Sequence, residues 1–454
     1  EWTRSASLNV GQIYTDNMEL ASDNEKDDLI TVVRPTVSAS GQGARASVDL
    51  NAALELNDLS GGSDNFVPLV NARGNVEMIE DFFFTDVYAR SYQVRTDPFR
   101  RSGDTALNRA ENADTTYMVG ISPYVQRRLG GFANAYSRYR TDRQISEDNG
   151  FDDSVQQEFD ASFVSGDDFT RLDWGLYGNT RTTDYSNNAG SGRGQDNDYS
   201  SADLRLGYRL NRQWRLTSSV GHEWREYDAD TQDRDENTWD AGFVWTPNPR
   251  TSLNVGYGDR YFENKPRFDL SWRSKRVELR AKYEHLLTDT RSVRGLNNDF
   301  SGTNPFGEPF DPVTGEPVPV SRNLTFQDAG LVSDERTEAS IALQGMRTRI
   351  RLTGRHSEQT RSDTGEEAIF DDILLNANRR LSSKLSLNAG MTWEGDEDES
   401  GLTSDTLRYF LGLNRQLGAR TSMAVNYSYA ERDSQRPDDD FEENRIYVNF
   451  TFTL

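Results

Sequence analysis

The sequence predicts an all-β fold, a single transmembrane, antiparallel, up-and-down β-barrel of about 22 strands, with roughly 18 as the lower bound. Three observations predict it. Segments of alternating polarity recur along the chain, short and long connections alternate between them, and the last segment is a two-faced strand with alternate aromatic residues. We therefore expect residues 1–454 to form one outer-membrane β-barrel.

The composition agrees with a barrel and excludes several other classes. Only 34% of the residues are hydrophobic and the mean hydropathy is −0.81, so no stretch is apolar enough for a membrane-spanning helix. A barrel conceals its apolar half in alternation. The 22 Phe, 19 Tyr and 8 Trp argue against disorder, and the net charge of −23 excludes a nucleic-acid partner. The absence of cysteine is compatible with an envelope protein.

The strands are expected to follow one another from the first residues onward. Because Glu1-Trp2-Thr3 already enters an alternating segment, we expect a mature chain whose export signal has been removed. The expected strand starts are Thr3, Leu29, Arg45, Val67, Phe82, Thr116, Phe132, Val155, Thr170, Tyr199, Gln213, Trp239, Thr251, Pro266, Val277, Arg336, Thr348, Asp372, Lys384, Thr406, Arg420 and Asn444.

The connections are asymmetric. The short ones, such as Gly41–Gly43, Leu129–Gly131 and Thr246–Pro249, are turn-like, and the long ones, such as Asp16–Asp28 and Arg95–Asp114, are acidic and rich in Gly and Asn. Outer-membrane barrels have short periplasmic turns and long extracellular loops. An even number of strands then places both termini in the periplasm, and the partners are outer-membrane lipid, lipopolysaccharide and the barrel-assembly machinery.

The longest loop, residues 288–332, holds five of the 13 prolines together with Phe306, Phe310 and Phe326. Proline stiffens the backbone and aromatic side chains need cover, so this extracellular loop is expected to pack on the rest of the molecule. Two alternatives stay open. The loop is either a constriction inside the lumen or an external lid. A separate plug domain is not expected, because the first strand begins almost immediately.

The last strand, Asn444–Leu454, is expected to close the barrel and to carry the assembly signal. Ile446 and Val448 lie on its outer face together with the C-terminal signal residues Phe450, Phe452 and Leu454, while polar residues lie on the other face. Aromatic residues also mark the two membrane interfaces. The expected girdle residues are Trp214, Trp224, Trp239 and Trp245.

The inward parity of the strands is rich in basic residues. The expected lumen or substrate-path residues are Arg205, Arg209, Arg215, Arg280, Lys282, Arg349, Arg351, Arg355, Arg408 and Arg420. Rings of Arg select anions in pores. The alternative is that these arginines pair across strands with inward carboxylates and simply satisfy a polar wall. Both readings stay open, because they can hold at different heights of the barrel.

No catalytic constellation, metal site or cofactor is expected. His222, His285 and His356 fall on outward parity in separate strands, and Ser218 shares a face with His222 without any further support for a lipid-facing enzyme. The acidic runs Asp396–Glu399 and Asp438–Asp440 lack a regular ligand spacing, so solvated loops are favoured over calcium sites.

An ordered set of turns resembles a known family. The segments are Gly41–Arg45, Ser47–Asn51, Ile121–Tyr124, Arg128–Ala133, Ser137–Tyr139, Leu172–Leu176 and Trp245–Thr251. Together they resemble the outer-membrane protein family associated with the PEP-CTERM/exosortase system, a relative of the β-barrel porins of exopolysaccharide loci. The resemblance extends over nearly the whole chain and implies a role in extracellular polysaccharide export or assembly. It supplies no catalytic residues.

Two functions are therefore expected. The first is a porin or channel for exopolysaccharide or other hydrophilic solutes, with extracellular polysaccharide and a periplasmic export component as partners. The alternative is a non-conducting surface anchor or assembly scaffold in the outer membrane. An enzyme is not expected.

Overall fold

A closed ring of 22 antiparallel strands forms the molecule in the computed structural model. The structure describes residues 2–59, 65–103, 112, 114–147, 152–186, 196–227, 234–261, 263–296, 302–303, 309–310, 325–326, 330–362 and 364–454. The first eleven strands are β1 (Trp2–Thr15), β2 (Asp28–Gln42), β3 (Ala46–Leu59), β4 (Asn65–Ile79), β5 (Phe83–Val94), β6 (Asp114–Leu129), β7 (Ala133–Ser146), β8 (Asp153–Ser165), β9 (Leu172–Ser186), β10 (Asn197–Arg209) and β11 (Trp214–Tyr227). The others in the ring are β12 (Arg234–Asn248), β13 (Thr251–Arg260), β14 (Glu263–Arg273), β15 (Val277–Asp289), β18 (Leu331–Gln344), β19 (Thr348–Arg361), β20 (Glu367–Arg380), β21 (Leu385–Glu397), β22 (Thr403–Gln416), β23 (Thr421–Ser434) and β24 (Phe441–Thr453).

The last strand closes the ring against the first. β24 pairs with β1 from Ser7 opposite Thr453 to Thr15 opposite Arg445, and with β23 on its other side. Its two faces differ as the alternation predicts. Phe450 on the outer face is 38% exposed, whereas Tyr447 on the inner face is buried. The predicted fold class, an all-β barrel of 22 strands, is confirmed.

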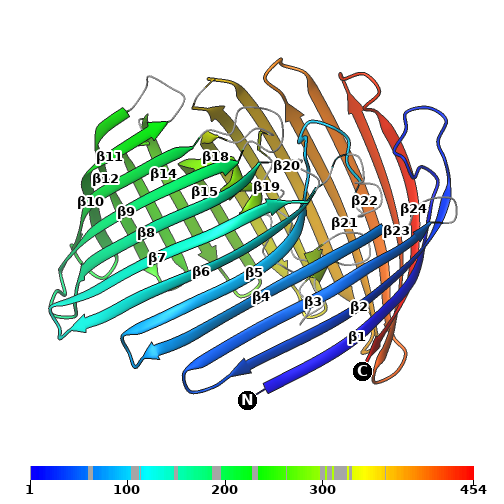
Figure 1. Cartoon of the computed structure of the whole chain (residues 1–454), viewed down its shortest axis with the longest axis horizontal. Helices are drawn as coiled ribbons and strands as arrows, with labels where there is room; N and C mark the ends of the chain where they lie inside the picture. The colour runs from blue at the N-terminus through cyan, green and yellow to red at the C-terminus, as the bar shows by residue number, and fades with distance from the viewer. Residues whose placement is uncertain are drawn as a thin grey trace.

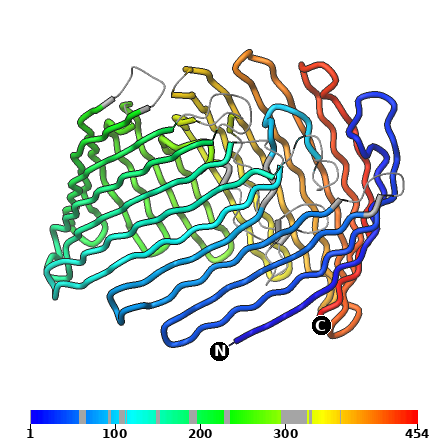
Figure 2. The backbone as a smooth tube through the Cα atoms, viewed as in Figure 1, coloured from blue at the N-terminus to red at the C-terminus, as the bar shows by residue number. Residues whose placement is uncertain are grey.

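The two ends of the barrel differ in their connections. Both chain termini lie at the same end as short connections such as residues 43–45, 80–82 and 130–132 (Figures 1 and 2). We call this the turn end. The opposite end carries the described parts of the long connections, including residues 16–27, 95–103 and 290–296, and we call it the loop end.

The alternation located every strand of the ring. The largest differences are at Trp239, Arg336 and Asp372, each expected five residues after the start of β12, β18 or β20. These strands begin at the loop end, where a strand extends beyond the region in which one face is exposed to lipid. Polar residues on both faces hide its true beginning.

The tryptophans lie on the outer face in two groups. Trp214 is directly opposite Trp245 in the β11–β12 pair, next to the turn end, and their rings stack at 5.7 Å between centroids. Trp224, near the loop end of β11, and Trp239 are 43% exposed. Trp239 is opposite Val220, so it lies four residues short of the level of Trp224.

Most of the buried apolar residues gather in three small clusters at the loop end. One contains Ile13, Ile30, Val32 and Tyr447; a second contains Phe326, Val332, Ala368 and Phe370; the third contains Leu20, Ala430 and Phe441. Apolar residues on the inner face of a barrel need cover. Segments of the long connections therefore pack inside the barrel at this end. Among the described residues, no helix is long and apolar enough to span a membrane.

Candidate functional site

A segment of the β5–β6 connection folds into a compact loop inside the barrel. We call residues 95–103 the docked loop. Asn112 holds its shape, because its side-chain oxygen accepts hydrogen bonds from Thr96 Oγ1 (2.8 Å) and the Asp97 N–H (2.7 Å). The Asn112 amide nitrogen donates back to the carbonyls of Asp97 and Arg101 at 2.9 and 3.1 Å. One amide thus fixes both arms of the loop.

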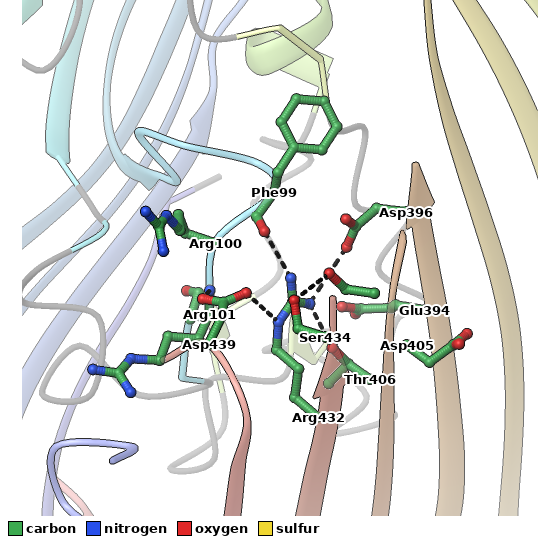
Figure 3. A network of polar contacts seen from close by, with 12 residues as sticks. Phe99, Arg100, Arg101, Glu394, Asp396, Asp405, Thr406, Arg432, Ser434 and Asp439 are labelled. Carbon is green, nitrogen blue, oxygen red and sulfur yellow. Dashed lines mark hydrogen bonds and ion pairs between the residues drawn. The ribbon is translucent and has the colours of Figure 1, made fainter. Parts of the chain in front are cut away.

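Arg432 of β23 binds the docked loop to the inner wall (Figure 3). Its guanidinium donates to the Phe99 carbonyl (2.7 Å), to Asp439 Oδ2 (3.0 Å) and to Thr406 Oγ1 (2.9 Å). It also pairs with Asp396 at 3.3 Å, and Arg432 itself is only 4% exposed. A buried guanidinium has to be paired and hydrogen-bonded, and here the loop carbonyl completes its set of acceptors.

Further polar contacts join the docked loop to neighbouring elements. Asp439 accepts a hydrogen bond from the Arg101 N–H at 2.8 Å, and Arg101 Nη1 donates to the Leu20 carbonyl at 2.6 Å. Arg408 of β22 donates to the Ser102 carbonyl at 3.1 Å and to Glu394 at 2.9 Å. The docked loop is therefore held by strands β21, β22 and β23, by the β23–β24 connection, which contains Asp439, and by the β1–β2 connection, which contains Leu20.

The aromatic ring of Phe99 supplies the apolar part of this contact. It stacks on Phe370 of β20, with the ring centroids 5.5 Å apart and an interplanar angle of 15°. The Arg436 guanidinium lies over the ring of Phe99, 5.3 Å from its centroid. Phe326 of the longest loop belongs to the same cluster. Stacking and cation–π contacts of this kind each contribute about 0.5–1.5 kcal/mol.

The docked loop reaches across a large part of the lumen. The ring order from β5 to β22 passes through β4, β3, β2, β1, β24 and β23, so the two strands are seven steps apart in a ring of 22. The greatest separation in such a ring is eleven steps. A loop that leaves β5 and binds Arg408 on β22 therefore has to lie inside the barrel.

A second segment crosses the lumen elsewhere. Helix α1 (Thr290–Leu296) follows β15, and Asp289 caps it by accepting hydrogen bonds from Ser292. Asp289 also accepts from Gln156 of β8 (3.3 Å) and Arg181 of β9 (3.4 Å). Arg291 forms an ion pair with Asp142 of β7. Because β9 and β15 are six strands apart, α1 likewise lies inside the barrel at its loop end.

Most of the expected lumen residues have a carboxylate partner. Arg215 pairs with Asp173 of β9 and Arg355 with Asp372 of β20, in each case across adjacent or nearby strands. The other pairs among the described residues are Arg205 with Asp203, Arg280 with Glu278, Lys282 with Glu284, and Arg408 with Glu394. Arg215, Arg355 and Arg408 thus pair between strands. Arg205, Arg280 and Lys282 instead pair with a carboxylate two residues away on the same strand.

The remaining four expected lumen residues differ from one another. Arg209 donates to the Thr170 carbonyl at 3.4 Å, and Arg420 lies in the turn before β23. Arg349 and Arg351 lie on the same face of β19, opposite Asn378 and Asn376. Toward the rest of the described chain, the side chain of Arg351 makes no ion pair or hydrogen bond. It is the position where an Arg of the wall can meet a solute.

The expected candidates omitted the residues that bind the docked loop, chiefly Asp396, Arg432, Arg436, Asp439 and Asn112. Arg432 lies on the inward parity of β23, two residues after Ala430, so alternation alone includes it in the lumen set. The alternation along β23 does not reveal that the loop after β5 supplies the Phe99 carbonyl as a partner of Arg432.

The longest loop, residues 288–332, lies mostly outside the described residues, including Pro305, Pro312, Pro317, Pro319 and Phe306. Its described ends, which include Arg291 and Phe326, lie inside the barrel. Two-residue strands β16 (Gly302–Thr303) and β17 (Pro309–Phe310) pair with each other.

The histidines lie apart from the lumen. His222 faces Asn237 at 3.0 Å, His285 faces Ser333 at 2.8 Å and His356 faces Asp371 at 2.8 Å. In the described part of the chain, no group of three His, Cys, Asp or Glu side chains is arranged to hold a metal ion.

The strands, the inner wall and the two inserted segments define a large barrel of the transmembrane type. No family model and no curated protein matches the chain. Solved structures share its fold. The FrpB iron transporter from Neisseria meningitidis is 8% identical with a TM-score of 0.55, over 99% of this chain and 81% of that chain. The ferric preacinetobactin receptor BauA from Acinetobacter baumannii is 11% identical with a TM-score of 0.55, over 100% and 81%.

A third example is the ferric-catecholate import receptor Fiu from E. coli K12 in its open form. It is 9% identical with a TM-score of 0.53, over 100% of this chain and 82% of that chain. At such low identity the likeness concerns the barrel fold alone.

Proposed function

We propose that the protein is an outer-membrane channel for hydrophilic solutes, and that the docked loop closes it in the state described here. One observation carries the proposal: a loop from β5 is bound six and seven strands away, on β23 and β22, by buried arginines that donate to the Phe99 and Ser102 carbonyls of the loop. A loop held in the lumen by polar contacts can be released without disturbing the strands. The turn end, with both termini, would face the periplasm.

Extracellular polysaccharide is the cargo that we propose first, through the resemblance of the turns to a family of exopolysaccharide loci. Lipopolysaccharide would surround the loop end, and a periplasmic export component would approach the turn end. The solved structures of similar fold are named as iron transporters and receptors of ferric siderophores. That the fold serves transport in those proteins supports a transport function for this one.

The closing contact is local, which suits a gate. Arg432 and Arg408 each have acceptors in the wall, Asp396 and Glu394, that remain after the loop leaves. Release would therefore exchange the Phe99 and Ser102 carbonyls for water without leaving a buried charge unpaired. Opening also has to break the stack of Phe99 on Phe370 and the hydrogen bonds of Arg101 to Asp439 and to the Leu20 carbonyl.

A reversible covalent lock tests the proposal. The chain contains no cysteine, so Phe99→Cys with Phe370→Cys introduces the only thiols, at two rings that lie 5.5 Å apart. Conductance is recorded in planar bilayers before and after a short bis-methanethiosulfonate cross-linker, which forms a disulfide with each cysteine and releases methanesulfinate. It is recorded again after these disulfides are reduced. We expect the uncross-linked variant to conduct more than the natural protein, the cross-linked form to fall to the natural level or below, and reduction to restore conduction.

Two controls give this experiment a clear outcome. The pair Ser5→Cys and Ser38→Cys joins hydrogen-bonded neighbours on β1 and β2, far from the docked loop, so its cross-linking should leave conductance unchanged. If the natural protein and the reduced Phe99/Phe370 variant conduct equally, the docked loop does not close the lumen. If neither conducts, the channel function itself is wrong.

A non-conducting surface scaffold is the second candidate. On the outer face near the loop end, Asp405 is directly opposite Asp433 and Glu431 is directly opposite Glu442. Like charges in opposed positions destabilise a sheet unless something outside neutralises them. Attachment of a surface polymer without conduction would favour this candidate, and the bilayer recordings above separate the two.

A further inference from the structure

A sector of the inner wall between the docked loop and the turn end has no carboxylate. It comprises uncharged inward positions of β20 to β24, bordered by the inward Arg380 of β20 and Arg445 of β24, and we call it the amide band. Its members are Asn376 and Asn378 of β20, Ser386, Asn388, Gly390 and Thr392 of β21, Phe410, Gly412, Asn414 and Gln416 of β22, Ser422, Ala424, Asn426 and Ser428 of β23, and Asn449, Thr451 and Thr453 of β24. In contrast, inward carboxylates and arginines alternate on β7 to β10.

Phe410 places a flat ring in this band. Its ring lies over Gly390 on the adjacent strand, so closely that a Cβ atom at Gly390 would collide with ring carbons. Only glycine permits this arrangement. The ring consequently lies along the wall with one face on the β21 backbone. Because the side chain is only half-buried, the opposite face of the ring points toward the lumen.

The ring is surrounded by amides in register. Asn376, Gly390, Phe410 and Ser428 form one row of directly opposed residues across four strands. The next row toward the turn end contains Asn378, Asn388, Gly412 and Asn426. The Asn426 amide lies over Gly412, which again has room only for hydrogen at Cα.

Several of these amides have unused hydrogen-bonding capacity. The Asn378 side chain donates to Asn388 at 2.5 Å, whereas the side chains of Asn376, Asn414 and Asn426 make no hydrogen bond with the described residues. Asn449 is 4% exposed, and its side-chain oxygen is buried without a partner in the described chain. Since buried polar atoms are normally satisfied, an unpartnered acceptor indicates a missing solvent or ligand donor.

We propose that the amide band with Phe410 is a binding site for uncharged sugar units. A pyranose ring has an apolar face of C–H groups that packs on an aromatic ring and a rim of hydroxyls that both donate and accept hydrogen bonds. An Asn side chain also does both, through its NH₂ and its oxygen. The band lacks carboxylates, its Arg445 is only 2% exposed, and Arg351 and Arg380 lie at its edges, so it offers little to an ionic solute.

The position of this site fits a gated conduit, and the inference rests on that proposed function for its role in transport. Phe410 is two residues from Arg408 on the same face of β22, and Arg408 binds the docked loop through Ser102. A sugar on Phe410 would thus lie directly below the docked loop, at the place that opening connects to the loop end. Binding itself needs no conduction.

Binding of a defined oligosaccharide to the full chain in detergent tests the site. The probe is maltohexaose, with an oligogalacturonate of equal length as the charged comparison, and affinity is measured by isothermal titration. We expect Phe410→Ala to weaken maltohexaose binding about tenfold or more, because a stacked ring is lost. Phe410→Trp should retain binding, and the oligogalacturonate should bind more weakly than maltohexaose.

Matched variants distinguish the site from general effects. Phe84→Ala removes an inner-wall aromatic ring on β5, outside the amide band, and should change the affinity by less than about twofold. Asn376→Ala with Asn426→Ala removes two unused amides and should weaken binding. Heat-modifiable migration in gels verifies that each barrel is folded.

The outcomes separate this inference from the channel function. If sugar binding depends on Phe410 but the protein does not conduct, the binding site is supported and the channel function is rejected. If the docked loop controls conduction but Phe410→Ala and Phe84→Ala bind maltohexaose with equal affinity, the channel function is supported and the sugar-binding site is rejected. Absence of any measurable binding of maltohexaose to the natural protein would also reject it.

Discussion

Single residues decide how the barrel is occupied, and Arg432 is the clearest example. It is buried, and four oxygens from four segments surround its guanidinium: Phe99, Thr406, Asp396 and Asp439. Only the Phe99 carbonyl comes from the distant β5–β6 connection. Arg432 therefore fixes the docked loop to the wall.

Arg432→Ala is expected to release the docked loop. The substitution leaves Asp396 and Asp439 without one cation, and breaking a buried ion pair costs about 3–5 kcal/mol. Arg100 and Arg101 then become available to trypsin, and limited proteolysis followed by mass spectrometry should find cleavage there at least about 100-fold faster than in the natural protein. As a matched control, Arg128→Ala removes a largely exposed pair with Asp167 and should leave the rate unchanged. Equal resistance of both variants would contradict the assigned role of Arg432.

A second residue-scale effect concerns acid. Burial alone would raise the pKa of Asp398, but hydrogen bonds from Arg436 and from the backbone N–H groups of Leu402 and Ser400 outweigh burial and hold that pKa below its usual range. A lowered carboxyl pKa stabilises the folded state above the ordinary pKa, and this contribution disappears as the pH falls through the lowered value. Arg436 lies over Phe99, so the docked loop should loosen in acid.

Hydrogen–deuterium exchange of residues 95–103 measures this loosening. After correction for the intrinsic pH dependence, protection should be constant at neutral pH and fall below about pH 4. Asp398→Asn, which cannot gain the proton, should show less protection at neutral pH and a smaller change in acid. A natural protein that keeps full protection at about pH 3 would exclude this role of Asp398.

At the scale of elements, the strands were predictable and the loops were not. A strand with one face to lipid and one to a polar lumen has to alternate, so strands such as β24 and β11 follow from the order of residue types alone. The path of the docked loop depends on which strand lies opposite β5 inside the closed ring. That relation involves residues such as Arg101 and Asp439, which are far apart in sequence, and no local pattern encodes it.

For the same reason, the function of the lumen residues could be predicted only in part from the sequence. Parity placed Arg355 and Arg408 on the inner wall, but the choice between anion selection and pairing depended on the positions of Asp372 and Glu394 on neighbouring strands. The amide band was present in the sequence as alternate Asn residues on β20 to β23. To recognise these residues as one site, the cross-strand register that aligns Asn376 with Phe410 had to be known.

Replacement of the docked loop tests its role as an element. Exchanging residues 97–101 for a Gly-Ser linker of equal length removes Phe99 and Arg101 but no strand, so the barrel should still assemble. We expect the single-channel conductance to rise severalfold, because the lumen contact with β22 and β23 is lost. Deletion of residues 304–320 in the longest loop provides the comparison. A rise only in that second variant would assign the constriction to residues 288–332 and contradict the docked loop.

At the scale of the whole molecule, closure between β1 and β24 makes every inner position part of one wall. The wall has a paired, charged sector around β7 to β10 and, between the docked loop and the turn end, a sector without carboxylates on β20 to β24. The docked loop joins a strand near the first sector to strands of the second. Because sheet closure removes both edges, the outer face remains the only surface that sets compatibility with the membrane.

The closing strand therefore has opposite tolerances on its two faces. Phe450→Arg places a charge in lipid, which costs about 2–4 kcal/mol at the bilayer midplane and about 0–1 kcal/mol near an interface. Phe450→Arg combined with Phe452→Arg should reduce the amount of heat-modifiable barrel in the outer-membrane fraction. Thr451→Arg is the matched control on the same strand, since Thr451 faces the lumen and bonds Asn9 at 3.2 Å. Equal assembly of the double variant and the Thr451 variant would show that the outer face of β24 does not control insertion.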